Sequence, residues 1–228
     1  MTGPDALLTA ALAGLGLPAR ASLERCRPPA PGDWVTSAAV RLARGGPQAA
    51  ELAGRLAVAL DSRPGVTAHA RPPGLVTLTV HDEVLAAMAT ALPGTWAQDA
   101  CVRGGCAPVV PGPRRRSRDD PAYAAVLAHA RLCRPLVPGD EGASIPAYDP
   151  VPHQVLVLLA DAHRVAARLR GEHRPHHLVD WLAATGSAVV TWTQDADLCR
   201  HDPRLVIAAR ATLASALRAA GLPPSERF

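Results

Sequence analysis

Residues 119–131 read Asp-Asp-Pro-Ala-Tyr-Ala-Ala-Val-Leu-Ala-His-Ala-Arg, and they open the part of the chain that decides its fold. Alanine and leucine are strong helix formers, and proline suits the first turn of a helix. Three later stretches follow the same plan, each beginning at or near a proline, and Gly221 is a typical stop signal for the last of them. The expected helices cover residues 121–136, 152–170, 175–194 and 203–220. Together they predict an all-α helical bundle over residues 119–228.

The region before this bundle, residues 1–92, mixes helical and strand patterns. Residues 75–80 alternate between two sets of side chains, as expected of a half-buried strand, and a second strand is expected over 66–70. Asp82 suits the N-cap of a helix reaching about residue 91, and Asp33 is interpreted as the cap of the helix that follows it. Further helices are expected over 2–15, 37–44 and 47–60. The region predicts a small α+β domain.

Between these regions, residues 93–118 are dominated by proline, glycine and arginine and end in Pro-Gly-Pro-Arg-Arg-Arg-Ser-Arg. Such a composition is typical of a linker, because it offers little apolar surface to bury. The fold class expected for the whole chain is therefore a small α+β domain followed by an all-α bundle, mostly helical overall.

The charge slightly favours a protein that binds nucleic acid over one that does not. The 228 residues carry a net charge of +4, and every basic residue other than histidine is an arginine, whose guanidinium binds phosphate oxygens in a fork. The five cysteines are odd in number and scattered, which indicates free thiols in a reducing, cytoplasmic setting. An N-terminus with Asp5 and no basic leader is a poor signal peptide, and no apolar run approaches the length of a membrane span.

Several motifs, in the same order, resemble arginyl-tRNA synthetases. Residues 119–131 are similar to the segment that opens the helical, DALR-type anticodon-binding domain of that family, and the closing Pro-Pro-Ser-Glu-Arg-Phe is similar to its C-terminus. The other similar segments are residues 32–43, 71–78, 174–178, 181–182 and 202–213. The resemblance covers both ends of the chain and skips the linker, where the family carries its catalytic domain. No His-x-Gly-His or Lys-Met-Ser-Lys-like signature is found in the sequence.

The resemblance implies a protein that is not an enzyme, has no catalytic residues or cofactor, and binds tRNA or a tRNA-like RNA. The first domain would correspond to the module that packs against the tRNA elbow. In the anticodon-binding domain, Ala124 and Leu127 stand where tyrosines are usual, while Arg131 is kept. Positions 124, 127 and 131 share one helix face. Loss of its aromatic residues predicts weak reading of bases, since each stacking platform contributes on the order of 1–3 kcal/mol per base.

The residues expected to contact RNA are arginines and terminal or aromatic side chains. They are Arg131, Arg134, Phe228, Trp34, Arg118 and Arg227. Plainer interpretations stay open: Arg131 as an ion-paired helix residue, the linker arginines as a solvated segment, and Phe228 as a tail or a docking group. Tyr123 and His129 are interpreted as packing and capping groups.

Neither the pair Cys101 and Cys106 nor the cluster of His173, His176, His177 and Asp180 is expected to bind metal. The cysteines lack two further ligands beside them, and Pro175 interrupts the helical register of the cluster. The alternative function is a protein-interaction module that pairs with a full-length synthetase or with itself. An exposed apolar patch would favour that alternative, and a continuous positive face would favour RNA.

Overall fold

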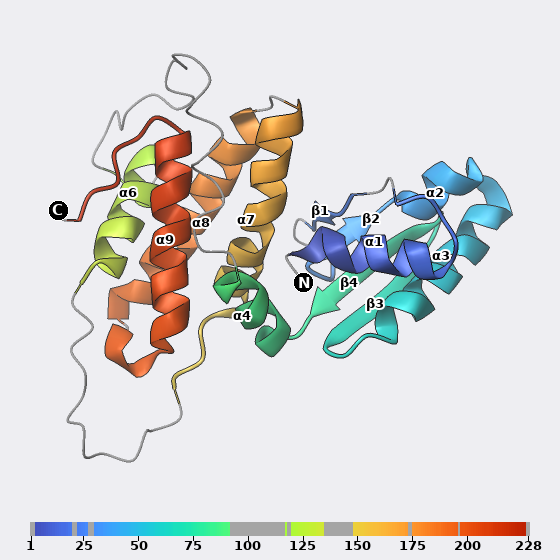
Figure 1. Ribbon diagram of the computed structural model, residues 1–228, viewed down its shortest axis with the longest axis horizontal. Helices are drawn as coiled ribbons and strands as arrows, with labels where there is room; N and C mark the ends of the chain where they lie inside the picture. The colour runs from blue at the N-terminus through green and yellow to red at the C-terminus, as the bar shows by residue number, and fades with distance from the viewer. Residues whose placement is uncertain are drawn as a thin grey trace. The chain divides into compact units, whose positions relative to one another are not determined.

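The computed structural model describes residues 3–19, 22–26, 30–91, 117, 120–134, 148–172, 175–195 and 197–226. They form two compact units, Met1–Ala87 and Met88–Phe228, and each is described by itself. Almost all of the predicted linker, including Cys101 and Cys106, lies outside the described residues. The fold is mostly helical α+β, with one small antiparallel sheet of four strands among the described residues (Figure 1).

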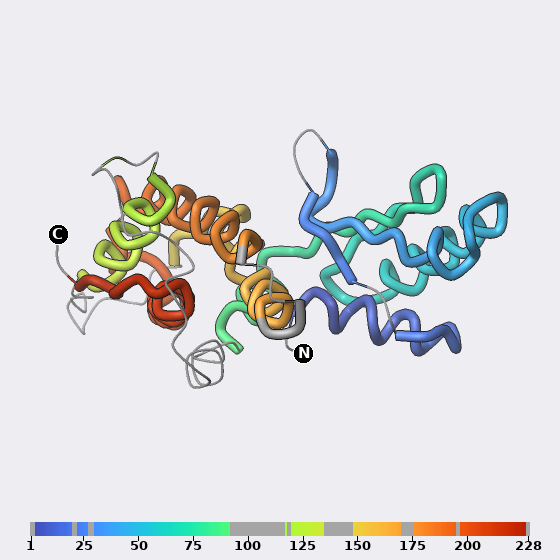
Figure 2. The backbone as a smooth tube through the Cα atoms, turned by 90° about the horizontal axis from the view of Figure 1, so that it is seen from above, coloured from blue at the N-terminus to red at the C-terminus, as the bar shows by residue number. Residues whose placement is uncertain are grey.

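In the first unit the sheet has the strand order β1-β2-β4-β3, and every pair of neighbours is antiparallel. Helix α3 packs against β3, β4 and α1 (Figure 2). The elements are α1 Pro4–Gly14, β1 Glu24–Arg25, β2 Trp34–Thr36, α2 Ala38–Ala43, α3 Gly46–Asp61, β3 Val66–Arg71 and β4 Leu75–Val80, and α4 Asp82–Thr90 crosses the boundary between the units.

Strand β4 has the predicted core face, but the alternation is incomplete, because Thr77 on the opposite face is also buried at 7% exposed. Val76, Leu78 and Val80 are at most 1% exposed and belong to the core of the first unit. Leu56 and Leu60 of α3 are also fully buried. The predicted strands and helices of this unit lie within two residues of the observed ones, whereas β1 and β2 were not predicted. Strands of two and three residues are too short to show an alternating pattern.

Asp33 does not cap a helix, so that interpretation was wrong. Its Oδ2 accepts a hydrogen bond of 2.8 Å from the backbone N–H of Val80, and its own N–H donates to the carbonyl of Leu78 at 2.8 Å. The following helix, α2, begins at Ala38, whose N–H is bound instead by the hydroxyl of Thr36 at 3.1 Å. Asp33 thus ends the pairing between β2 and β4.

The second unit is a helical bundle in which α6 packs against α8 and α9, and α7 packs against α8 (Figure 1). Its elements are α6 Pro121–Leu132, α7 His153–Glu172, α8 Pro175–Asp195, the short 3-10 helix η1 Leu198–Arg200 and α9 Pro203–Ala219. All four predicted helices are present, and each begins within one residue of its prediction. Helix α6 ends four residues earlier than expected.

Aspartates directly before the prolines start two of these helices. Asp120 accepts hydrogen bonds from the N–H groups of Ala122 and Tyr123, at 2.9 and 3.1 Å, and Asp202 accepts one from Arg204 at 2.8 Å. A capping carboxylate satisfies backbone donors that have no partner within the helix. The Asp-Pro pairs therefore fix where α6 and α9 begin.

Helices α6 and α8 cross at very close range. A Cβ atom on Gly186 of α8 would lie 2.6 Å from the backbone N of Ala125 and 2.8 Å from the backbone C of Ala124. Only glycine permits this approach, because both neighbours are backbone atoms of α6. Within the described part of the chain, no helix is long and apolar enough to span a membrane.

Candidate nucleic-acid interface

Arg131 lies half-buried between α6 and α8. Its Nη1 donates to the backbone carbonyl of Val190 at 3.1 Å. Hydrogen bonds from a charged donor are stronger than neutral ones, so this contact ties the two helices together. Arg131 therefore has a packing role, whichever ligand the protein takes.

The helix face that carries positions 124, 127 and 131 is largely covered by α8. Ala124 is 2% exposed and lies at the close crossing with Gly186, and Leu127 is half-buried. A base could not stack on a face that is already packed against another helix. At Ala124 this face is thus used for packing inside the bundle.

The other predicted contact residues have different positions. Arg134 is exposed, just beyond the C-terminal end of α6. Trp34 is 0% exposed and pairs in register with Leu78 in the sheet, so its prediction as an RNA contact was wrong. A fully buried indole offers no surface to a ligand. Arg118, Arg227 and Phe228 lie outside the described residues.

Helix α9 carries a basic surface on its exposed face. Arg204, Arg210 and Arg218 are exposed, and Ile207 between them is 49% exposed. At 100° per residue these four side chains fall within one arc of roughly 120°. No aspartate or glutamate occurs between Pro203 and Ala219. We call Arg134 and these four residues the arginine surface.

The opposite face of α9 is buried in the bundle and fixes the direction of the arginine surface. Leu205, Val206, Ala209 and Leu213 are at most 7% exposed. Arg204 and Arg218 are separated by fourteen residues, or about 21 Å at 1.5 Å per residue. This surface was not predicted from the sequence. A helical projection of residues 203–219 would have indicated it, because the arginines fall on one side and the segment contains no aspartate or glutamate.

Helix α6 packs against α9, and the carbonyl of Ser225 in the C-terminal segment is bound by His129, four residues before Cys133. Burial raises the pKa of the Cys133 thiol, while the nearby positive charge of Arg210 lowers it and the negative charge of Glu226 raises it. Cys133 directly precedes Arg134 in the chain. The end of α6, the middle of α9 and the C-terminal segment therefore converge there.

His129 connects α6 to the C-terminal segment. It is 4% exposed, and its Nδ1 lies 2.8 Å from the backbone carbonyl oxygen of Ser225, 96 residues further along the chain. A carbonyl oxygen only accepts, so Nδ1 carries the proton of this hydrogen bond. The sulfur of Cys133 lies 3.8 Å from both ring nitrogens. The prediction that His129 is a packing group is confirmed.

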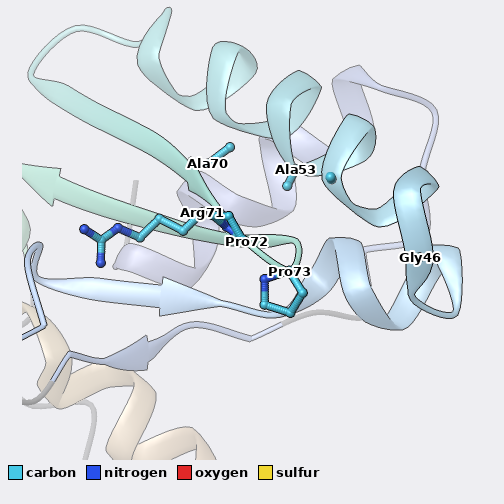
Figure 3. Close-up of a pocket in the computed structure, with 7 residues that line it drawn as sticks. Gly46, Ala53, Ala70, Arg71, Pro72 and Pro73 are labelled. Carbon is cyan, nitrogen blue, oxygen red and sulfur yellow. The ribbon is translucent and has the colours of Figure 1, made fainter.

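The first unit contains an open groove of about 330 Å³ between the start of α3 and the β3–β4 turn (Figure 3). It is lined by Gly46, Ala50, Ala53, Ala70, Arg71, Pro72 and Pro73. Alanine, glycine and proline side chains supply no nucleophile, acid or base. The guanidinium of Arg71 extends away from Ala53 and Pro73 in Figure 3.

Other candidate sites find little support in the part of the chain that the structure describes. It contains no cluster of three His, Cys, Asp or Glu side chains that could hold a metal ion. His173 lies outside the described residues, and His176 is exposed beside His177, with ring centroids 4.2 Å apart. The exposed large hydrophobic residues described are Val58 on α3, Ile207 on α9 and Tyr148, which precedes α7.

Chemistry at the arginine surface is limited to binding. Guanidinium groups donate to phosphate oxygens, and Ile207 offers an apolar contact to a ribose or a base face. Comparison of the chain with protein-family models, with curated proteins and with solved structures gave no match in any of the three.

Proposed function

We propose that this protein is a non-catalytic, cytoplasmic RNA-binding protein that binds tRNA or a tRNA-like RNA. The observation that carries the proposal is the outward face of α9, with three exposed arginines, one exposed isoleucine and no acid. Its second support is the resemblance of residues 119–131 and 202–213 to the anticodon-binding domain of arginyl-tRNA synthetases.

Phosphate contacts would supply most of the affinity. Arg134, Arg204 and Arg210 are exposed, and each phosphate that an arginine neutralises releases condensed counterions. The 21 Å length of the α9 face, about six phosphates of one strand in a duplex at 3.4 Å each, suits an extended backbone better than a single phosphate. Reading of bases would be weak, because the face around Ala124 is packed against α8.

The alternative, a protein-interaction module, has less support among the described residues. Ile207 is the one exposed large hydrophobic side chain described on the arginine surface, and it is flanked by arginines. A partner synthetase or a second copy of the chain would need an apolar contact area. Val58 is on α3 and Tyr148 precedes α7, so neither adds to the exposed apolar surface of α9 itself.

The test is binding of fluorescently labelled, unfractionated tRNA to the full chain over a salt series. We expect the triple variant Arg134→Ala, Arg204→Ala, Arg210→Ala to bind more weakly and to flatten the slope of log K against log salt by about 2–3.

The matched control is Arg41→Ala, Arg44→Ala, Arg55→Ala, which removes three exposed arginines from the first unit. It has the same change in net charge and should flatten the slope less than the variant of the arginine surface does. Equal slopes for both triple variants would refute the arginine surface. Failure of the wild-type chain to bind tRNA at low salt would refute the function.

A further inference from the structure

The groove of the first unit has walls that are held in place. The β3–β4 turn lies against the start of α3, because a Cβ atom on Gly74 would lie 2.9 Å from the Cβ of Ala49 and 3.1 Å from its backbone C. The N–H of Gly74 also donates to the carbonyl of Arg71 at 2.9 Å, and Pro72 and Pro73 have a φ fixed by their rings. The groove is therefore formed before any ligand enters it.

The lining of the groove suits a small apolar side chain with a negative charge beside it. Ala53 in the lining is 1% exposed, while Ala50 and Ala70 are exposed. The volume of about 330 Å³ is near the lower end of the roughly 300–1,000 Å³ typical of ligand sites. Arg71 is the charged residue among the described lining residues, and Figure 3 shows its guanidinium extending away from Ala53 and Pro73.

Strand β3 is the last strand of the described sheet, so one of its edges has no neighbouring strand among the described residues. In an antiparallel pair, the N–H and C=O groups of successive residues point alternately to the partner strand and away from it. The N–H of Ala68 points away, since it donates to Oδ1 of Asp61 at 3.1 Å. The N–H of Val66 does the same and donates to the carbonyl of Arg63 at 3.2 Å. The chain itself thus occupies two outer donors of β3.

Ala70 is the next residue whose backbone groups point outward by this alternation. Among the described residues it has no partner comparable to Asp61, and it is exposed beside the groove. A residue of an added antiparallel strand could exchange two hydrogen bonds with Ala70. Its side chain would lie on the same face as that of Ala70, at the groove, and the preceding residue of the added strand would lie opposite Arg71.

We propose that the groove binds an extended peptide segment of a partner protein. The segment pairs antiparallel with β3 at Ala70, places a small aliphatic side chain in the groove, and sets an acidic side chain, one residue earlier, opposite Arg71. This is a second binding activity, in the unit that does not carry α9, and it does not rest on the proposed binding of RNA. The outward N–H and C=O of Ala70 favour a peptide, because both groups match the backbone of a β-strand.

The test is a titration of the full, isotope-labelled chain with the blocked peptide Val-Asp-Val-Thr-Val, followed by the NMR shifts of the backbone amides. In a second peptide lysine replaces aspartate, and in a third the central valine is N-methylated, which removes its backbone donor. Both peptides are also titrated into Arg71→Glu. The matched control is Arg55→Glu, which reverses the charge of an exposed arginine on α3 outside the described lining.

We expect the aspartate peptide to shift the amides of residues 50–53 and 70–71 with a Kd on the order of 1 mM, since one pair of backbone bonds exceeds the cost of association only slightly. N-methylation should weaken binding about five- to tenfold. Arg71→Glu should weaken the aspartate peptide and strengthen the lysine peptide about two- to fivefold each, and Arg55→Glu should change neither.

Three results would overturn the proposal. No shifts at these amides with several millimolar peptide would remove the site, and equal affinity of the N-methylated peptide would remove the pairing with β3. An unchanged preference for aspartate in Arg71→Glu would remove the role of that arginine. Shifts of the same amides by tRNA, reversed by salt, would assign the groove to RNA in place of a peptide.

Discussion

Replacing Gly186 by alanine tests the close crossing of α6 and α8 directly. The new Cβ would lie 2.6 Å from the backbone N of Ala125 and 2.9 Å from its Cα. Ordinary carbon contacts begin near 3.5 Å, so one helix must move by close to 1 Å. Backbone atoms cannot escape by changing rotamer, and we expect a cost near the upper end of about 1–3 kcal/mol for overpacking. Alanine regains about 1 kcal/mol of helix propensity, which leaves a net destabilisation of about 2 kcal/mol.

The same substitution at Gly54 of α3 provides the matched control. A Cβ there would meet no atom within 4 Å, so only the propensity term remains. We therefore expect Gly54→Ala to stabilise the first unit by up to about 1 kcal/mol. Replacing glycine by alanine is thus expected to lower stability at position 186 and to raise it at position 54.

Thermal unfolding followed by circular dichroism and tryptophan fluorescence measures both effects. Trp181 and Trp192 are buried in the second unit and report on the crossing. A loss of about 2 kcal/mol in a unit of this size lowers its Tm by roughly 5–10 °C. An unchanged or raised Tm for Gly186→Ala would refute the crossing, and a lowered Tm for Gly54→Ala would show that the control glycine has a role beyond propensity.

Four further substitutions or reactions test single contacts. Asp161→Ala removes a carboxylate bound to Arg164 at 2.7 Å in a pair at most 8% exposed, and should cost about 3 kcal/mol in urea unfolding; a loss below 1 kcal/mol would contradict its burial. Asp120→Ala should lower stability by about 1 kcal/mol through loss of the α6 cap, which the same unfolding curves would detect. Arg131→Ala should lower stability by about 1–2 kcal/mol yet leave the salt slope of tRNA binding almost unchanged, whereas a fall in slope without lost stability would restore Arg131 to the RNA surface. Because burial raises the pKa of Cys133, its thiol stays protonated to higher pH, so iodoacetamide at pH 8 should label exposed Cys199 first, as peptide mass spectrometry would show.

Local signals in the sequence were enough to predict the helices and the strands β3 and β4. An Asp-Pro pair and a helical pattern act over a few residues, so the starts of α6 and α9 follow from nearby residues alone. The short strand β2 depends on pairing with β4, more than forty residues further along the chain. Nothing local to Trp34 or Asp33 reveals that pairing, and both were therefore misinterpreted.

In the candidate site, too, some positions follow from nearby residues and others depend on contacts between distant parts of the chain. Arg134 is exposed as expected, because it lies beyond the end of its helix. Arg131 was assigned to the surface from its motif, but its position depends on where α8 packs. The α9 face could have been found from helical periodicity alone, whereas the contact between His129 and Ser225 joins residues 96 positions apart and has no local signature.

The hydrogen bonds of Asp33 at the end of the pairing between β2 and β4 have a practical use. The N–H of Cys26 donates to the carbonyl of Asp33 at 2.9 Å, and the Asp33 carboxylate accepts a hydrogen bond from the N–H of Val80. Cys26 and Asp33 are therefore held by hydrogen bonds that the residues between them do not make. Insertions between such anchors tend to be tolerated. An affinity tag or a fluorophore attached at exposed Ala30 or Pro31 would therefore leave both anchoring bonds and every residue of α9 unchanged.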